Sequence, residues 1–296
     1  GGLMEMVVAM PRRLRPIALF AVILALVIGC QGNLNVSQKL PEVPAESTPP
    51  LTLNGTGASF PMLFYDKLFS EYRAINPDVL VNYQPTGSAA GIQQMISKTV
   101  DFAASDVAMT DEEIAQVEAG VVMIPMTAGS IAIAYNLPGL AGPLKLTREA
   151  YSRIFLGEIT QWNDSLITNA NPDLNLPDLP VILVHRSDGS GTTAVFTAHL
   201  SAISPQWKDQ VGTGLNVNWP AGVGIKSNAG VSAQIQQAEG AIGYVEYSYA
   251  QKLGLSVAAL ENSAGRFVEP GLEAAQAGLM EADFPENLRA FVPDPS

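Results

Sequence analysis

Residues 186–193 combine chemical groups that bind small anions. They read Arg-Ser-Asp-Gly-Ser-Gly-Thr-Thr, so that a guanidinium is followed by glycines and hydroxyl side chains. An apolar run at 181–185 precedes this segment, and a helical pattern at 194–202 follows it. The N–H groups at the start of a helix, with a guanidinium and hydroxyls beside them, favour a small oxyanion. This segment alone leaves phosphate, sulfate and a substrate carboxylate as alternatives.

Two further junctions between an expected strand and an expected helix have the same character. Residues 55–61 place Ser59 two positions before a proline, and residues 86–91 place Ser88 directly after Gly87. Ligands of open α/β sheets bind at the carboxyl ends of the strands, where all three junctions are expected to lie. An ordinary helix N-cap explains any one of them. Together they predict one anion site.

Apolar runs and helical patterns alternate along the chain from residue 51, which predicts an α/β fold with mainly parallel sheets. The expected strands and helices are as follows. Strands are expected at 51–54, 79–83, 102–105, 121–125, 129–136, 181–185 and 241–245, and helices at 61–73, 90–98, 111–116, 148–156, 194–202 and 230–238.

The first 50 residues resemble an export signal and a tether. A basic stretch at 12–15 and twelve apolar residues at 17–28 precede Cys30, the single cysteine of the chain. This pattern is typical of a lipoprotein signal peptide over residues 1–29, with lipidation of Cys30 after cleavage. Residues 31–50 are rich in proline and polar side chains, so residues 30–50 are expected to tether the folded part to the outside of the cell membrane. The alternative is a buried free cysteine after an uncleaved anchor.

Composition excludes several classes of function. A formal net charge of −12 argues against a nucleic-acid partner. The two histidines and the single cysteine predict no metal site, and no cofactor is expected. Ser190 has glycine on both sides, but a nucleophile elbow needs glycines two residues away, where Asp188 and Thr192 stand. We therefore expect binding without turnover, and a phosphoester hydrolase is a weaker alternative.

Seven segments, in this order, resemble the high-affinity phosphate-binding protein of bacterial phosphate ABC transporters. They are residues 55–61, 87–88, 101–106, 157–164, 186–193, 211–214 and 240–247. The resemblance implies a type II periplasmic binding protein with two lobes and a hinge, lobe 1 at 51–125 and lobe 2 at 126–296. It also implies a monomer that binds phosphate outside the cytoplasm and delivers it to permease subunits. A scavenging or sensory protein without a transporter is the alternative.

The resemblance also implies a set of phosphate-binding residues. They are Ser59, Phe60, Ser88, Asp106, Arg186, Ser190, Gly191 and Thr192, supported by Gly87, Gly189 and Asp188, whose carboxylate would pair with Arg186. Asp106 would accept a proton carried by the ligand, which favours phosphate over sulfate and leaves arsenate hard to exclude. Without the resemblance, Asp106 is equally a cap of the next helix, and Arg186 a strand-end cation.

The family continues past the position of Pro295, returning to complete lobe 1, whereas this sequence stops at Ser296. We therefore expect lobe 1 to be incomplete, with apolar surface and a sheet edge uncovered. A truncation is the favoured explanation, and a segment supplied by another chain is the alternative.

Overall fold

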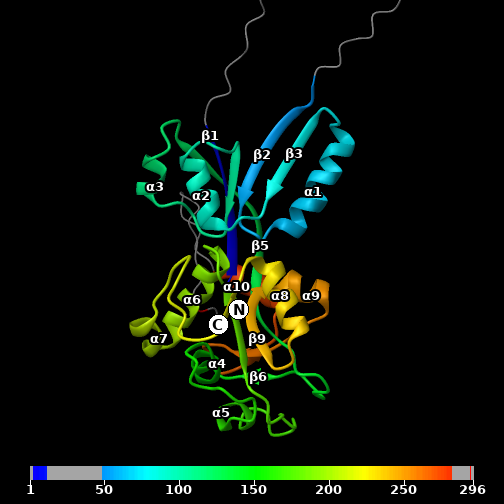
Figure 1. Cartoon of the computed structure of the whole chain (residues 1–296), viewed down its shortest axis with the longest axis vertical. Coiled ribbons are helices and arrows are strands. Elements are labelled where there is room, and N and C mark those ends of the chain that lie inside the picture. Colours follow the sequence, from blue (N-terminus) through cyan, green and yellow to red (C-terminus); the bar gives the residue numbers. More distant parts are fainter. Residues whose placement is uncertain (1–2, 12–48, 282–293, 295–296) are drawn as a thin grey trace, which may run out of the picture.

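The computed structural model describes residues 3–11, 49–281 and 294 of the 296-residue chain. Two lobes lie one above the other in Figure 1, and β5 (Val121–Tyr135) runs from one to the other. A nine-stranded sheet passes through both lobes in the order β3-β2-β4-β1-β5-β9-β7-β8, with β10 also paired to β5.

Lobe 1 contains three parallel strands, with β2 (Leu51–Gly57) between β3 (Val79–Gln84) and β4 (Phe102–Ser105). Each strand leads toward a helix, and these are α1 (Met62–Ile75), α2 (Ser88–Ile96) and α3 (Asp111–Ala115). The expected strands and helices of this lobe are therefore present, with ends that differ by at most three residues.

Strand β5 is continuous, although two strands separated by a break were expected. Its first part pairs with β1 as far as Ser130, and from Ile131 it pairs with β9. Proline donates no hydrogen bond to a ladder, so Pro125 is an unfavourable residue within a paired strand. The strand accommodates Pro125 where the register with β1 shifts by one residue. The expected lobe boundary at 125/126 thus falls inside β5, about five residues before the pairing changes lobe.

Lobe 2 is built on β9 (Ala241–Glu246), β7 (Ile182–Arg186) and β8 (Val223–Ile225), with β10 (Ser256–Val257) on the other side of β5. The helices of this lobe are α4 (Arg148–Phe155), α5 (Ser165–Thr168), α6 (Gly191–Ile203), α7 (Pro205–Gln210), α8 (Ser227–Gln237) and α9 (Tyr247–Leu253). None of the helices in the described residues is both long and apolar enough to span a bilayer.

The main core lies in lobe 2 and is rich in aromatic side chains. Trp162, Trp207 and Tyr244 are fully buried, and the two indole N–H groups donate to the carbonyl oxygens of Gly240 and Gly212 at 2.9 Å. Large buried rings of this kind contribute most of the apolar stabilisation of a lobe and hold its loops in place.

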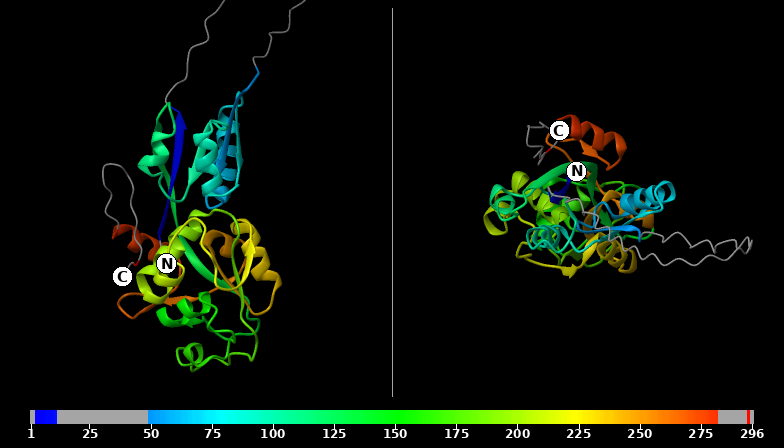
Figure 2. Two further views of the ribbon diagram at one scale, coloured as in Figure 1. Left: turned by 60° about the vertical axis from the view of Figure 1, so that its left-hand side comes forward. Right: turned by 90° about the horizontal axis from the view of Figure 1, so that it is seen from above.

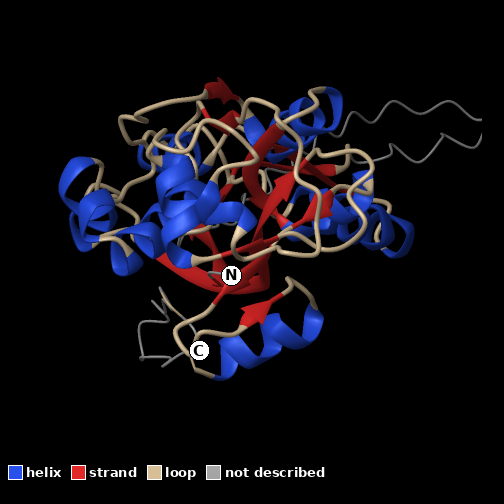
Figure 3. Ribbon diagram, turned by 90° about the horizontal axis from the view of Figure 1, so that it is seen from below, coloured by secondary structure: helices blue, strands red, loops and turns tan. Residues whose placement is uncertain are grey.

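A small sheet and a last helix lie at one side of the molecule. The sheet has the order β12 (Phe267–Val268), β11 (Ala259–Glu261), β6 (Lys145–Leu146). Helix α10 (Leu272–Met280) follows β12 and runs close to β1. Figure 2 and Figure 3 show this helix against the flank of the molecule rather than inside it.

Strand β1 (Leu3–Pro11) is a difference from the expected leader. It lies between β4 and β5 and is antiparallel to both. The segment is apolar apart from Glu5, so its composition suits a strand paired on both edges. Residues 3–11 therefore form part of the lobe 1 sheet in this chain, whereas residues 12–29, Cys30 and most of the tether lie outside the described residues.

Apolar side chains are exposed on lobe 1. A groove of about 260 Å³ is lined by side chains from α1, β2, β3, β4 and β5. Tyr72, Ile124 and Met126 at this groove are 45%, 38% and 38% exposed. An apolar groove of this kind promotes association with other apolar surfaces.

Candidate anion-binding site

The three junctions identified in the sequence lie together between the lobes. Ser59 belongs to the loop from β2 to α1, Ser88 is the first residue of α2, and Ser190 is the N-cap of α6. The Ser190 hydroxyl accepts the N–H of Thr193 at 3.2 Å. Ser59 does not cap α1, which begins after Pro61 without a side-chain cap. Its hydroxyl and its carbonyl bind lobe 2 instead.

Hydrogen bonds join the two lobes directly at this site. The Ser88 hydroxyl accepts the N–H of Gly191 at 3.1 Å and that of Asp106 at 3.3 Å. The N–H of Ala89 in lobe 1 donates to the carbonyl of Gly189 in lobe 2 at 3.0 Å. The structure is therefore a closed arrangement, in which α2 of lobe 1 meets the start of α6 of lobe 2.

Two glycines allow this close approach. A Cβ atom on Gly191 would lie 2.4 Å from the Cβ of Asp106, and one on Gly189 would lie 2.3 Å from the Cβ of Ala89. Contacts that short do not occur between carbon atoms in folded proteins, so larger residues would hold the lobes apart. Gly189 and Gly191 thus support the site through their lack of a side chain.

Arg186 is held rigid by Asp188. Its Nε and Nη2 atoms donate to the two carboxylate oxygens at 2.7 Å and 2.5 Å, and both side chains are almost fully buried. Burial acts to raise the pKa of Asp188, but the hydrogen bonds and charge of Arg186 lower it below its ordinary value. Two nitrogens of the guanidinium are occupied by Asp188, and Nη1 has no hydrogen-bond partner within the described residues.

Asp106 supplies the acceptor of the site. It is 5% exposed, and burial raises its pKa to about 7 against the opposing charge of Arg186. Oδ2 accepts the hydroxyl of Thr192 at 3.4 Å. Asp106 does not cap α3, because Thr110 occupies that position and forms a capping box with Glu113.

Several polar atoms at this site have no hydrogen-bond partner in the part of the chain that the structure describes. Among the described residues, four buried side-chain polar atoms have no hydrogen bond, and Asp106 Oδ1 and Arg186 Nη1 are two of them. In the same part of the chain, the backbone N–H groups of Ser59 and Phe60 also lack a partner. Buried polar groups are rarely left unpaired unless they serve a ligand. The site therefore offers many donors and one acceptor.

Three polar residues of the site were not singled out from the sequence. Asn228 on α8 donates to Ser59 Oγ and Thr192 Oγ1, and Tyr249 donates to the carbonyl of Ser59 at 2.6 Å. Burial raises the pKa of Glu246, which caps α9 through Ser248. One sequence signal could have identified Asn228. Ser227 and Asn228 are polar residues just after the short strand β8, at the start of α8, and so form a fourth strand-to-helix junction.

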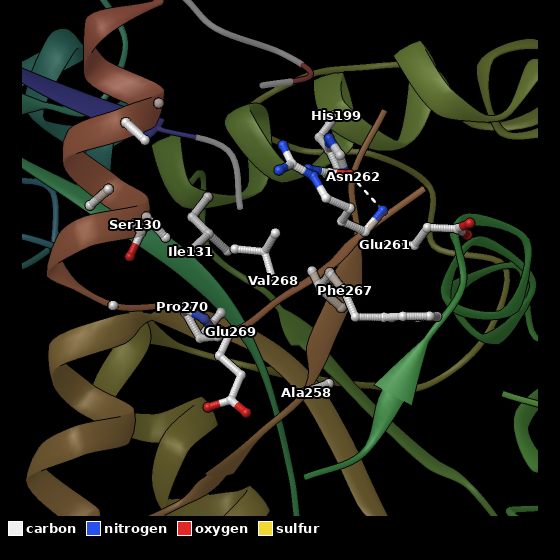
Figure 4. A pocket seen from close by; sticks show the side chains of 18 of the residues that line it. Ser130, Ile131, His199, Ala258, Glu261, Asn262, Phe267, Val268, Glu269 and Pro270 are labelled. Atoms are coloured by element: carbon white, nitrogen blue, oxygen red, sulfur yellow. Dashed lines mark hydrogen bonds between the residues drawn. The ribbon is translucent and has the colours of Figure 1, made fainter. Parts of the chain in front are cut away.

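A second cavity lies away from this site (Figure 4). It has a volume of about 380 Å³ and contains none of the residues predicted to bind an anion. Glu261 and Glu269 lie in its wall, and His199 accepts or donates a hydrogen bond with Tyr151 at 2.8 Å. Among the described lining residues the carboxylates of Glu261, Glu269 and Asp294 outnumber the guanidinium of Arg266, which disfavours an anion. Within the described residues, no cluster of three metal-binding side chains occurs.

Two lobes connected by a strand, with a donor-rich site where they meet, define the class of type II two-lobed binding proteins. The model of the PBP superfamily domain matches residues 43–290. The chain is 45% identical over 241 residues to the phosphate-binding protein PstS of Pasteurella multocida, which covers 81% of this chain and 69% of that protein. It is 34% identical over 281 residues to PstS of Methanocaldococcus jannaschii, covering 91% and 70%. The chain belongs to the PstS family of phosphate-binding proteins.

Solved structures support the fold. A putative phosphate ABC transporter substrate-binding protein from Clostridium perfringens, with bound phosphate, has a TM-score of 0.60 at 20% identity and covers 81% of this chain and 84% of its own. A DING protein has a TM-score of 0.60 at 22% identity, covering 79% and 69%. These likenesses show that the chain has the two-lobed binding-protein fold.

Proposed function

We propose that this protein binds inorganic phosphate between its two lobes and delivers it to an ABC importer. The observation that carries the proposal is that one site holds a buried acceptor, Asp106 Oδ1, and a buried donor, Arg186 Nη1, each without a hydrogen-bond partner among the described residues. The names of the relatives, PstS among them, agree with this ligand.

The donors would bind the phosphate oxygens. Arg186 Nη1 supplies a charge-assisted hydrogen bond, and the N–H groups of Ser59 and Phe60 supply backbone donors. At the start of α6, the N–H of Gly191 is bound to the Ser88 hydroxyl and that of Thr192 to Asp106, so these two residues would contribute through the positive end of the helix. The hydroxyls of Ser88 and Ser190 already accept N–H groups, so their own protons are free to donate. Many neutral donors bind a dianion without the full neutralisation that would make release slow.

Asp106 would select the ligand. An ionised carboxylate only accepts hydrogen bonds, and hydrogen phosphate carries a proton that it can donate. Sulfate carries none at neutral pH, so two acceptors would face each other in a buried site, which is unfavourable. Arsenate has the same protons as phosphate and is expected to bind.

The same proposal includes an extracytoplasmic location and a monomeric state. We propose that residues 1–29 are removed, that Cys30 carries a lipid, and that residues 30–50 tether the lobes to the membrane. In the described structure, residues 3–11 form β1. Turnover is not part of the proposal: Ser190 Oγ is bound to the N–H of Thr193 rather than to a histidine.

Calorimetric titration of the phosphate-free protein with phosphate, sulfate and arsenate tests the ligand. We expect saturable binding of phosphate and arsenate and no measurable binding of sulfate. Equal affinity for sulfate and phosphate would overturn the choice of ligand.

Delivery is tested separately in vesicles that contain the permease subunits. We expect uptake of radioactive phosphate only when the binding protein is present. Tight phosphate binding with no effect on uptake would favour a scavenging or sensory protein instead.

A further inference from the structure

Asn228 lies at the point where the two lobes meet. It is the second residue of α8 and is completely buried. The preceding residue, Ser227, has a φ of 66°, in the left-handed region that side chains other than glycine rarely adopt. The N–H of Ser227 donates to Asp188 Oδ1 at 3.1 Å, so the carboxylate that holds Arg186 also holds the start of α8. The strained backbone of Ser227 is maintained only because neighbouring contacts, such as the one with Asp188, hold it in place.

Every polar group of the Asn228 side chain has a partner. Nδ2 donates to Ser59 Oγ at 3.1 Å and to Thr192 Oγ1 at 3.3 Å, while Oδ1 accepts the N–H of Glu246 at 3.1 Å. The N–H of Glu246 is a donor only, so the atom facing it must be the oxygen of the amide. This bond fixes the orientation of the amide and directs both of its protons to hydroxyl groups.

The bonds from Asn228 determine what the Ser59 hydroxyl does. Ser59 Oγ accepts two N–H groups, from the backbone and from the side chain of Asn228, both at 3.1 Å. A hydroxyl has two lone pairs and one proton, so with both lone pairs used its proton must be donated elsewhere. No acceptor for that proton is found among the described residues, and the unpartnered N–H groups of Ser59 and Phe60 lie in the same loop. The proton is therefore available to an anion bound beside this loop.

Asn228 also orients the hydroxyl of Thr192. Its hydroxyl accepts from Asn228 and donates to Asp106 Oδ2 at 3.4 Å. This donation uses one oxygen of the carboxylate and leaves Oδ1 as the acceptor for a protonated ligand. One amide thus orients a donor of lobe 1 and, through Thr192, the acceptor of the site.

We propose that Asn228 is a positioning residue. By donating two hydrogen bonds to the Ser59 hydroxyl it directs the proton of that hydroxyl toward the ligand, and it does so only when the lobes are closed. The inference rests on the proposed binding of phosphate. Asn228 acts through Ser59 and Thr192 and does not itself contact the ligand. Because Asn228 belongs to lobe 2 and Ser59 to lobe 1, the same bonds form only when the lobes meet.

A double-mutant cycle tests the proposal, with phosphate affinity measured by calorimetry for the unmutated protein, Asn228→Ala, Ser59→Ala and the double variant. We expect each single change to weaken binding by about tenfold or more, and the second change to add much less than its own single effect. Residues that act as a unit show this non-additivity, whereas independent structural damage adds. Additive losses in the cycle would overturn the proposal.

Two further variants keep the test decisive. Asn171→Ala is the matched control, since Asn171 is a buried asparagine whose amide bonds Lys145 and the carbonyl of Ile167 away from the site. It should lower the melting temperature and leave phosphate affinity unchanged; an equal loss of affinity would contradict the proposal.

If Asn228→Ala does not fold, Asn228→Asp replaces it in the cycle, because it keeps the acceptor for Glu246 and the size of the side chain. Absence of phosphate binding by the unmutated protein would overturn the proposed function and this inference together, whereas binding with additive losses overturns this inference alone.

Discussion

Asp106 and Arg186 divide the recognition of an anion between an acceptor and a donor. Their resemblance to family positions was evident in the sequence, and the structure brings both to the closed site with one unpartnered atom each. Asn228, Tyr249 and Glu246 were not found in advance, because a polar residue at a helix start is usually a cap. Their contribution depends on contacts between residues up to 190 positions apart, which local sequence patterns do not contain.

The raised pKa of Asp106 predicts how stability depends on pH. Burial raises this pKa from 3.8 to about 7, so the folded chain binds the proton more tightly than the unfolded chain. The contribution of Asp106 to the free energy of unfolding therefore falls as pH rises from about 4 to about 7, by a few kcal/mol, and is level above about 7. Denaturant titration of the phosphate-free protein across this range should show a steeper fall than Asp106→Asn. Parallel curves for the two proteins would contradict the assignment.

The pair of Arg186 and Asp188 predicts a large effect of removing one partner. Asp188→Ala leaves a buried guanidinium without its carboxylate, which costs about 3–5 kcal/mol in comparable pairs. Denaturant unfolding should show this loss, together with weaker phosphate binding as the guanidinium loses its fixed orientation. The exposed pair of Lys98 and Glu118 is the control, and Glu118→Ala should change stability by less than about 1 kcal/mol.

At the scale of elements, the alternation of strands and helices predicted most of the fold. Strand β4 (Phe102–Ser105) has the expected ends, and the two core strands of lobe 2 were found within a residue or two. Strand β5 was predicted as two strands, at 121–125 and 129–136, and is one strand in the structure. The local irregularity with β1 that accommodates the proline is a property of the pairing, so the sequence of β5 alone did not reveal it.

The contact between α2 and α6 predicts the effect of a methyl group at their junction. Gly191→Ala would place a Cβ 2.4 Å from the Cβ of Asp106, which prevents full closure of the lobes. We expect phosphate affinity to fall by about tenfold or more and small-angle X-ray scattering with phosphate to show a larger radius of gyration.

Gly271→Ala is the control for this substitution, because no atom lies within 4 Å of its added Cβ and its φ of 178° suits any residue. It should bind phosphate as the unmutated protein does. Unchanged affinity and closure in Gly191→Ala would show that the glycine is not needed for the lobes to meet.

In the molecule as a whole, two interpretations of residues 3–11 are in conflict. The fold uses these residues as strand β1, whereas the proposed signal peptide predicts their removal. The strand fills the position between β4 and β5, so its removal would leave two strand edges unpaired and separate them. A lipobox before Cys30 predicts that these residues are lost on export. The sequence indicated the leader because basic and apolar stretches precede the cysteine, and only the fold shows the pairing of the strand.

Removal of residues 1–29 is therefore predicted to lower the melting temperature and to promote aggregation through the lobe 1 groove. Calorimetric melting of this variant and of one lacking only residues 12–29 separates the strand from the apolar run. The second variant keeps β1 and should melt close to the full chain. Equal, cooperative melting of all three would contradict a stabilising role for β1.

The selection of phosphate over sulfate by Asp106 can be measured by titrating the unmutated protein and Asp106→Asn with both anions. At pH 8 the carboxyl is mostly ionised, so the unmutated protein should bind phosphate and reject sulfate by at least about a hundredfold in calorimetric titrations. Asp106→Asn replaces one acceptor oxygen with a donor, and we expect it to lose this preference and bind sulfate. Sulfate binding by the unmutated protein as tight as phosphate binding, or an unchanged preference in Asp106→Asn, would contradict the account.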